Sequence, residues 1–158
     1  MRYSKLLDVA CGDHIHDWIP YYGLAGDTTA IDLRDDCQGQ HDADHFYPMD
    51  LNGERFHLFF EDGEFDFVLS DHTIEHLDDP HTFYQTLCRM SSKLVIIKTP
   101  VGWMENMFKN LKDGTHKYHF SKTWFIQYRP KGWSIWTRTL PRFNRLTPID
   151  EMEIVLRK

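Results

Sequence analysis

The sequence has few cysteines and no long apolar run. Only 3 cysteines occur, Cys11, Cys37 and Cys88, and they form neither a CxxC pair nor a zinc-binding spacing. An odd, widely spaced set argues against a disulfide framework and is typical of reduced thiols. The longest apolar runs, such as Leu94–Ile97, are far shorter than a membrane span, and Asp8 interrupts the start of the chain before a signal-peptide core could form. We therefore predict a soluble, cytoplasmic protein that has no membrane partner.

The sequence also lacks internal repeats, low-complexity tracts and linkers rich in glycine, serine or proline. With 158 residues, of which 41% are hydrophobic, the chain has the length of one ordinary domain and can bury one core. Its formal net charge of -6 conceals an asymmetry, because residues 1–88 are acidic and residues 89–158 are basic. The two halves either interleave and neutralise each other, or form an acidic cofactor half and a basic substrate half.

Short apolar runs recur along the chain and predict six strands. Between the third and fourth lies a helical pattern, with Asp79 as the N-cap and Pro80 at the first helical position. Phe83, Leu87 and Met90 recur on one face of this helix. The order strand, helix, strand favours a parallel α/β architecture. The predicted strands are Leu6–Val9, Ala30–Leu33, Phe65–Leu69, Leu94–Ile97, Ser134–Thr139 and Met152–Leu156.

The end of the chain has a different pattern. A second helix is predicted over residues 122–128, with Ser121 as its cap and Pro130 beyond its end. The last two strands have no helical pattern between them, only LPRFNRLTPID. They should therefore pair antiparallel, as a hairpin with a long loop.

The stretch LLDVACG carries the first functional signal. A buried strand ending in Asp8, followed by Ala10, Cys11 and Gly12, delivers the chain to the carboxyl edge of a parallel sheet, where open α/β folds bind ligands. The next strand, AIDL, ends in Asp32, close to the offset at which an acidic side chain meets a ribose diol. Because Gly12 stands alone, the loop lacks the GxGxxG cradle for a pyrophosphate. The pattern favours an adenosine-type cofactor without phosphates over a dinucleotide.

These residues resemble the class I S-adenosylmethionine-dependent methyltransferases, particularly the type 11 subgroup. The resemblance rests on LLDVACG, AIDL and FEDGEFDFVLSDHTIEHLDDP, and it covers most of residues 5–100. It implies an enzyme with a single-domain, Rossmann-like α/β fold. The seven-stranded sheet would be mostly parallel with an antiparallel last strand and helices on both faces. The seventh strand would be a short one near Phe46–Pro48.

The resemblance also implies a division of the chain and a set of site residues. Within one domain over 1–158, residues 1–100 would form the cofactor half, 101–130 a substrate lid and 131–158 a C-terminal hairpin. The loop after Asp8 would line the methionine part of S-adenosylmethionine, Asp32 would hold the ribose, and Asp50 would face the adenine amino group. The implied cofactor-binding residues are Asp8, Ala10, Cys11, Gly12, Asp32, Leu33, Asp50, Leu51, Ser70 and Asp71.

Two departures from the family pattern, DVGCGxG, stand in the first loop. Ala10 replaces the first glycine and His14 the last, and a side chain costs conformational freedom where positive φ is needed. The helix that usually precedes the first strand is also absent, so the substrate edge is expected to be open or to be covered by a second copy or a partner protein. An alternative is a non-catalytic binding or assembly protein of this fold with weakened cofactor affinity.

The methyl acceptor is expected to be a small molecule, methylated on oxygen or nitrogen. The fourth strand is followed by Ser70, Asp71 and His72, not by the Asn/Asp-Pro-Pro-Tyr motif of DNA amino methylation, and the chain has no Pro-Cys pair for cytosine C5 chemistry. Both absences disfavour a nucleic acid. His72 is the candidate general base, because an unperturbed imidazole titrates near neutral pH; a purely local hydrogen-bonding role is the alternative.

Basic and aromatic residues of the second half suggest what the acceptor is like. Arg138, Arg142 and Arg145 could clamp an anionic acceptor, although surface arginines are commonly only solvated. The segment from Val101 to Arg129 is rich in aromatic residues, of which about half are expected to line a pocket and the rest to be core.

His72, Glu75 and His76 form an HxxEH pattern. The i, i+3, i+4 spacing predicts that all three lie on one helical face, which is a ligand geometry. The pattern resembles the ExxEH of some methyltransferases of ubiquinone biosynthesis and of small RNA ends that hold a divalent metal. His116 or His119 could add a ligand. Because Glu-His occurs widely in the type 11 group without metal, we predict no metal, with these residues as the ligands if one binds.

Overall fold

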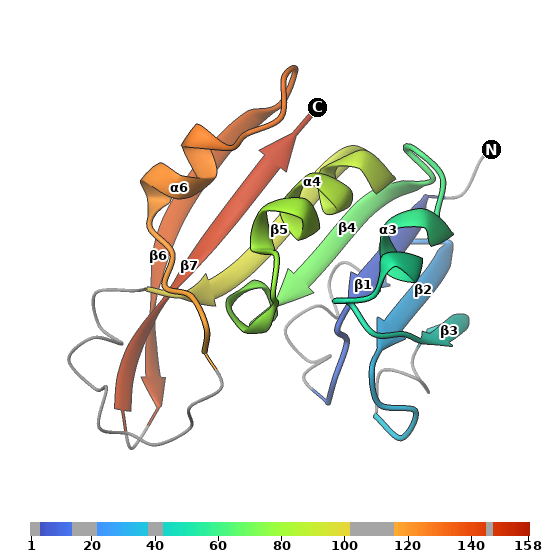
Figure 1. Ribbon diagram of the computed structural model, residues 1–158, viewed down its shortest axis with the longest axis horizontal. Helices are drawn as coiled ribbons and strands as arrows, with labels where there is room; N and C mark the ends of the chain where they lie inside the picture. The colour runs from blue at the N-terminus through green and yellow to red at the C-terminus, as the bar shows by residue number, and fades with distance from the viewer. Residues whose placement is uncertain (1–3, 14–21, 38–42, 102–115, 145–146) are drawn as a thin grey trace.

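The structure is a computed structural model of the 158-residue chain, and it describes residues 4–13, 22–37, 43–101, 116–144 and 147–158. Seven strands form one mixed sheet in the order β3-β2-β1-β4-β5-β7-β6 (Figure 1). The neighbours from β3 to β5 pair in parallel, whereas β7 is antiparallel to both β5 and β6. This arrangement confirms the predicted fold class. The strands are β1 Lys5–Val9, β2 Asp27–Asp32, β3 His45–Pro48, β4 Phe65–Asp71, β5 Ser91–Pro100, β6 Ser134–Asn144 and β7 Thr147–Arg157.

Three α-helices are described: α3 Glu54–Phe59, α4 Pro80–Met90 and α6 Lys122–Gln127. In Figure 1 all three lie on the same side of the sheet, in front of it. Both predicted caps form, because the side chains of Asp79 and Ser121 accept hydrogen bonds from backbone N–H groups of the first helical turns. Helix α3 was not predicted, and it has no side-chain cap that would mark its start. No helix among the described residues is long and apolar enough to cross a bilayer.

Aromatic contacts join the helices into one core against the sheet. The rings of Phe56 on α3 and Phe83 on α4 stack with centroids 5.6 Å apart. Tyr84 on α4 meets Phe125 on α6 edge to face at 5.5 Å, and its hydroxyl donates to the Phe125 carbonyl. Phe120, from the aromatic-rich segment, is also buried in this core. Trp103, Met104, Met107 and Phe108 lie outside the described residues.

The prediction of a long loop between the last two strands is wrong. Strands β6 and β7 each run for 11 residues and stay paired as far as Asn144↔Thr147. The loop was expected over LPRFNRLTPID, a segment that contains Pro141 and Pro148. Proline is tolerated where a strand has a free edge, and β6 is the last strand of the sheet. Strand β7 pairs with β5 only from Glu151 onward, so Pro148 also lies at a free edge.

Ion pairs join the acidic half of the sequence to the basic half. Four basic residues from 89–158 each reach a carboxylate from 1–88, so the charges of the two halves are partly paired where the halves meet. The two halves do not interleave within the sheet, because residues 1–88 form the neighbouring strands β3, β2, β1 and β4 and residues 89–158 form the neighbouring strands β5, β7 and β6. The pairs are Arg89–Asp62, Lys93–Asp66, Lys98–Asp71 and Lys117–Asp78.

Candidate cofactor and acceptor site

The carboxyl ends of β1, β2 and β4 meet at one edge of the sheet, which we call the carboxyl edge. Strand β1 lies between the other two, with Asp8 opposite Ala30 on β2 and Leu69 on β4. The predicted cofactor-binding residues lie at or just after the ends of these strands and of β3, so the topology brings them to the same edge.

The turn after β1 needs left-handed backbone at two positions. Ala10 has φ 59° and Gly12 has φ 46°, and the N–H of Cys11 between them donates to the Ile31 carbonyl at 3.1 Å. Glycine adopts this conformation freely, whereas a residue with a Cβ pays about 1 kcal/mol. Ala10 therefore carries strain where the family pattern has glycine. His14, the second departure, lies outside the described residues.

Asp32 ties the loops after β1 and β2 together. Its Oδ2 accepts from the N–H of Gly12 at 2.9 Å, and its Oδ1 accepts from the N–H of Arg34 at 2.9 Å. Each carboxylate oxygen has a second lone pair that can take a further donor. Asp32 can thus fix both loops and still accept hydrogen bonds from a diol.

Asp8 is a buried carboxylate, with only 1% of its surface exposed. Its Oδ2 accepts from the Tyr22 hydroxyl at 3.0 Å, while its Oδ1 has no hydrogen-bond partner among the described residues. Burial raises the pKa of Asp8 to about 7; the Tyr22 hydrogen bond opposes this, and the negative charges of Asp71 and Asp32 add to it. The ends of β1 and β2 thus bring acidic groups close together, and a cationic ligand would reduce their mutual repulsion.

Cys11 packs against a cysteine that sequence reasoning did not assign to the site. Its Sγ lies 3.6 Å from the Sγ of Cys37, and both thiols are buried and free. Burial, with the nearby Asp8 charge, raises the pKa of the Cys11 thiol far above its usual range. The thiol stays protonated and shapes the loop by packing. Cys37 stands 26 residues away without a motif, so no signal in the sequence could have identified it.

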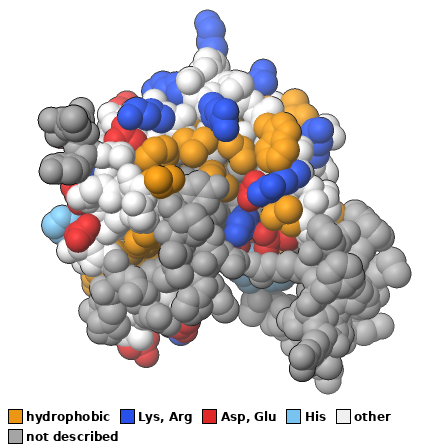
Figure 2. Space-filling view, turned by 180° about the vertical axis from the view of Figure 1, so that it is seen from behind, with side chains coloured by type: hydrophobic (Ala, Val, Ile, Leu, Met, Phe, Trp, Pro, Cys, Tyr) orange, Lys and Arg blue, Asp and Glu red, His pale blue; other side chains and the backbone are white. Residues whose placement is uncertain are grey.

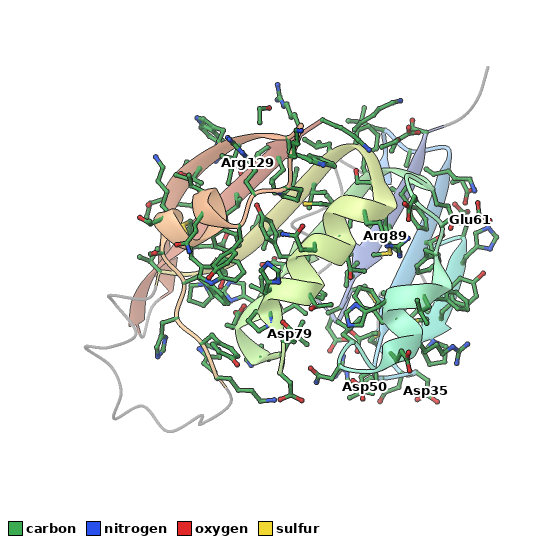
Figure 3. All side chains as sticks on the ribbon, turned by 45° about the horizontal axis from the view of Figure 1, so that its top comes forward. Asp35, Asp50, Glu61, Asp79, Arg89 and Arg129 are labelled. Carbon is green, nitrogen blue, oxygen red and sulfur yellow. The ribbon has the colours of Figure 1, made fainter. Side chains whose placement is uncertain are left out.

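The residues predicted for the adenine side follow β2 and β3. The Met49 N–H donates to the Asp32 carbonyl at 2.7 Å, which places the loop after β3 beside the end of β2. Asp50 is exposed, accepts from the Asn52 N–H at 2.9 Å, and lies near Asp35 at this end of the molecule (Figure 3). Leu51 is buried, whereas Leu33 is 70% exposed. This region offers a carboxylate and an apolar surface at the same edge.

The end of β4 carries a second group of charges. Ser70 is buried, and its Oγ has no hydrogen-bond partner among the described residues. His72 has a left-handed backbone, with φ 48°, and its Nε2 lies 3.0 Å from Glu151 Oε2. Its Nδ1 lies 3.4 Å from Glu75 Oε1. Burial alone would lower the pKa of His72, but hydrogen bonds to Glu151 and Glu75 and the charge of Asp71 raise it to about 9.

Two residues of this group, Glu151 and Lys98, were missed in the sequence. Lys98 is buried on β5, and its Nζ lies 4.0 Å from both Asp71 and Glu151. Glu151 stands 79 residues after His72 and joins it because β7 pairs with β5. The signals available were a lysine inside the apolar run VIIKTP and the alternation in EMEIVLR, and neither indicates a partner.

The spacing predicted that the HxxEH residues lie on one helical face, and this prediction is wrong. His72 has left-handed backbone and precedes the short 3₁₀ helix Ile74–His76. The cluster is nevertheless compact. One ligand atom from each of Glu75, His76 and His116 lies within 4.8 Å of the other two. His119, the other predicted ligand, is exposed and is not part of this group.

Arg138 does not reach the end of β4. Its guanidinium forms two hydrogen bonds to Glu153 on β7, at 2.8 and 3.1 Å. Strand β6 is separated from β4 by β5 and β7, a distance of about 14 Å at ordinary strand spacing. The side chain of Arg142 and all of Arg145 lie outside the described residues. The position of Arg138 therefore does not support the predicted arginine clamp.

The residues at the carboxyl edge fit a phosphate-free nucleoside that carries positive charge. Asp32 can accept from a ribose diol, and the turn from Ala10 to Gly12 offers no glycine-rich phosphate cradle. The unpartnered Asp8 oxygen and the neighbouring acidic groups favour a cation over an anion. S-Adenosylmethionine has this combination, because it joins an adenosine to a sulfonium and an ammonium group.

Solved structures share this fold across nearly the whole chain. An S-adenosylmethionine-dependent methyltransferase from Mesorhizobium loti has a TM-score of 0.74 at 12% identity, over 98% of this chain and 90% of that one. One from Archaeoglobus fulgidus has a TM-score of 0.72 at 14% identity, over 99% and 86%. A chain from Haloferax volcanii, solved in complex with the Trm112 methyltransferase activator, has a TM-score of 0.75 at 11% identity, over 99% and 82%. At these identities the likeness shows the fold alone.

The sequence itself identifies the family. No curated protein matches the chain. The type 11 family, described as a methyltransferase domain, matches residues 7–94, which is more than half of the chain and includes the end of β1, all of β2 and β4, and the predicted cofactor loops. The chain therefore belongs to the type 11 family of S-adenosylmethionine-dependent methyltransferases.

Proposed function

We propose that this methyltransferase transfers a methyl group to an oxygen or nitrogen atom of a small, uncharged polar molecule. The observation that carries the proposal is the pairing of the cofactor loop with the end of β4, where Val9 lies opposite Ser70. An acceptor bound beside Ser70 and His72 would stand next to the methionine end of the cofactor.

Different residues are proposed to contact the ribose, the adenine and the methionine part of the cofactor. Asp32 would accept hydrogen bonds from the ribose hydroxyls, and Asp50 would accept from the adenine amino group. The backbone from Ala10 to Gly12 would line the methionine part, while Asp8 would offset positive charge. When bound, the cofactor supplies an electrophilic methyl group on its sulfonium. Residues 1–100 would thus be the cofactor half, 101–130 the lid and 131–158 the hairpin.

The protein's own contribution is proposed to be chiefly alignment, which can supply much of the rate enhancement in a two-reactant transfer. His72 is the proposed base, which would take the proton that the acceptor loses. Because the pKa of His72 is raised to about 9, the imidazole is mostly protonated at pH 7, and a base role therefore predicts that turnover rises as the pH increases toward 9. The position of His72 after β4, and the contacts from Glu151 and Glu75 that fix its ring, support this role. A base role predicts that His72→Asn lowers kcat by roughly 10²-fold or more and leaves cofactor affinity unchanged. A local structural role would instead change stability and cofactor affinity together.

The proposal of an uncharged acceptor follows from the charges. The described residues at the end of β4 combine three carboxylates, Asp71, Glu75 and Glu151, with two basic side chains, His72 and Lys98. The lysine is already engaged by two of these carboxylates, so the group offers no strong site for an anion. Hydroxyl or amino groups could hydrogen-bond there without adding net charge.

A partner protein or second copy is also proposed, on two grounds. A groove of about 640 Å³ lies on the sheet face opposite the three helices, lined by Leu94, Ile96, Val155 and Trp136, the last 55% exposed (Figure 2). The Haloferax volcanii relative, which forms a complex with an activator, is the second ground. Light scattering across protein concentrations, with Trp136→Ser as the comparison, tests self-association through this face.

The experiment that tests the function has two parts. Calorimetric titration with S-adenosylmethionine and S-adenosylhomocysteine should give one site per chain. Methyl transfer from labelled cofactor is then measured with a panel of hydroxyl, amine and carboxylate acceptors, of which the uncharged polar members should be methylated. Turnover confined to carboxylates or phosphates would overturn the acceptor class. Cofactor binding without turnover on any acceptor would favour the alternative, a non-catalytic binding protein.

A further inference from the structure

We propose that Cys11, Cys37 and Asp32 bind one thiophilic divalent metal ion, such as Zn²⁺ or Cd²⁺, and that this ion competes with the cofactor for Asp32. One ligand atom from each residue lies within 4.8 Å of the other two, and all three residues are buried. The cysteine spacing does not suggest such a site, because 26 residues separate Cys11 from Cys37. The fold creates it, since the parallel strands β1 and β2 place the loops that follow them side by side.

The distance between the two sulfur atoms fits one bound ion. In a tetrahedral site with zinc–sulfur bonds of about 2.3 Å, two thiolates lie roughly 3.8 Å apart. The Sγ atoms of Cys11 and Cys37 are 3.6 Å apart, so they could hold an ion with little movement. A carboxylate oxygen bonded to the same ion would stand roughly 3.6 Å from each sulfur. The Asp32 oxygen, within 4.8 Å of both, therefore needs to shift by roughly 1 Å at most.

The Asp32 carboxylate has room for an ion although two N–H groups already hold it. Its oxygens accept one hydrogen bond each, from Gly12 and Arg34, and each oxygen keeps a second lone pair. The two N–H groups would orient the carboxylate toward an ion, as supporting hydrogen bonds do in metal sites. The Cys37 thiol donates to the Arg34 carbonyl at 3.6 Å. The loop after β2 thus positions a sulfur and an oxygen ligand before any ion binds.

Apolar side chains enclose the two sulfur atoms. Cys11 and Cys37 form a buried cluster with Ala30, and Ala43 and Phe46 pack against this cluster. In such surroundings the effective dielectric constant is low, so the attraction between thiolates and a divalent ion is stronger than in water. Without an ion the thiols stay protonated and neutral, and the apolar surroundings then impose no cost for a buried charge.

The donor set decides the class of ion. Two thiolates favour zinc, and the chemically similar cadmium, over magnesium and calcium, which prefer oxygen ligands. Three protein ligands leave the fourth tetrahedral position for a water molecule.

The competition with the cofactor rests on the proposed ribose role of Asp32, whereas the ion site itself does not. Both ligands would use lone pairs of the same carboxylate, so each should weaken the binding of the other. By thermodynamic linkage the two effects are equal in size, and we expect roughly 10-fold or more.

Cobalt distinguishes this site from clusters of nitrogen and oxygen ligands, because a sulfur-to-cobalt charge-transfer band in the near ultraviolet requires thiolate ligands. The chain is freed of metal with a chelator, kept reduced with a phosphine and titrated with Co²⁺, after which Zn²⁺ is added as competitor. One Co²⁺ per chain should give this band, and Zn²⁺ should abolish it. Cys11→Ser and Cys37→Ser should each weaken this binding by roughly 100-fold or more.

Cys88→Ser is the matched control, since Cys88 is also buried and free but lies on α4, outside the cluster. The chain has 3 cysteines, so a band that persists in this variant comes from Cys11 and Cys37. The control therefore tests the site even where a serine in the apolar cluster prevents folding. Thermal unfolding of each metal-free variant, with Cys37→Ala as a second replacement, shows whether the chain folds.

The outcomes support or overturn the site. A band kept in Cys88→Ser and lost in folded Cys37→Ser or Cys37→Ala supports it. No band at millimolar Co²⁺, a band of equal strength in Cys37→Ala and wild type, or loss of the band in folded Cys88→Ser would overturn it.

The competition is measured separately, by titrating S-adenosylhomocysteine into the metal-free and the Zn²⁺-loaded chain. Weaker binding to the loaded chain supports the competition, and equal affinities would overturn it. Absence of binding to the metal-free chain would contradict the proposed function, while the cobalt band still decides the ion site, so the two failures are distinguishable.

Discussion

The two ends of the carboxyl edge differ in the partners of their carboxylates. After β1 and β2, Asp8 and Asp32 are held by backbone N–H groups and a tyrosine hydroxyl, and among the described residues neither forms an ion pair with lysine or arginine. After β4 and β5, Glu151 contacts both His72 and Lys98. The first region thus leaves its negative potential for a bound cation, whereas the second largely neutralises itself. For this reason we propose that the cofactor binds at the first region.

The largest expected effect is the pH dependence of stability that Asp8 causes, and it tests the first of the two regions. The folded protein keeps the Asp8 proton up to a pKa of about 7, whereas the unfolded chain releases it near 3.8. This raised pKa makes the free energy of unfolding fall as pH rises from about 4 to 7, by on the order of 3 kcal/mol. Asp8→Asn should remove this fall. Urea unfolding of both chains without cofactor, from pH 4 to 8, measures it; parallel curves for the two chains would contradict the account.

The second prediction tests the ribose role of Asp32. Replacing it with alanine removes the acceptor for two hydroxyls and releases the N–H groups of Gly12 and Arg34. Asp32→Ala should weaken S-adenosylhomocysteine binding by about 2 kcal/mol, roughly 30-fold. Asp35→Ala, an exposed aspartate three residues later, is the matched control and should bind as wild type does. An equal loss of affinity in the two variants would show that the effect comes from removing one negative charge and not from a ribose contact of Asp32.

The third prediction tests the self-neutralised region. Glu151→Gln removes the carboxylate shared by His72 and Lys98, so both basic groups lose a partner. Because His72 is about one-third exposed, solvent reduces the cost, and we expect a loss of about 1–2 kcal/mol in unfolding free energy. Urea unfolding at pH 7 measures it. Glu61→Gln, in the turn between α3 and β4, should have no effect. An unchanged free energy of unfolding in Glu151→Gln would show that its contacts are not stabilising.

The smallest expected effect concerns the strained turn. Ala10 adopts φ 59°, so Ala10→Gly should relieve strain and raise the thermal unfolding midpoint, with a gain of about 0.5–1 kcal/mol. Ala25→Gly is the control, because this alanine is not among the residues with positive φ and should lose stability. Calorimetry measures the thermal unfolding midpoint of both variants. If Ala10→Gly lowers the midpoint as much as Ala25→Gly does, Ala10 is not strained.

Local patterns in the sequence predicted what depends on neighbours along the chain. The capping residues Asp79 and Ser121 and the strand ending in Asp8 are such features, since alternation, caps and turns involve only a few residues. Contacts set by topology were not predictable. Glu151 meets His72 only because β7 inserts between β5 and β6, and His72 leaves the helix that its spacing suggested because the chain turns sharply after β4.

The central claim is that the β1–β2 end of the carboxyl edge binds the adenosine part of the cofactor, and a crystal structure grown with S-adenosylhomocysteine tests it most directly. The account predicts both ribose hydroxyls within hydrogen-bonding distance of the Asp32 carboxylate, and the adenine ring between Leu33 and Leu51 with its amino group facing Asp50. A ribose bound elsewhere, with Asp32 contacting only the backbone of Gly12 and Arg34, would contradict it.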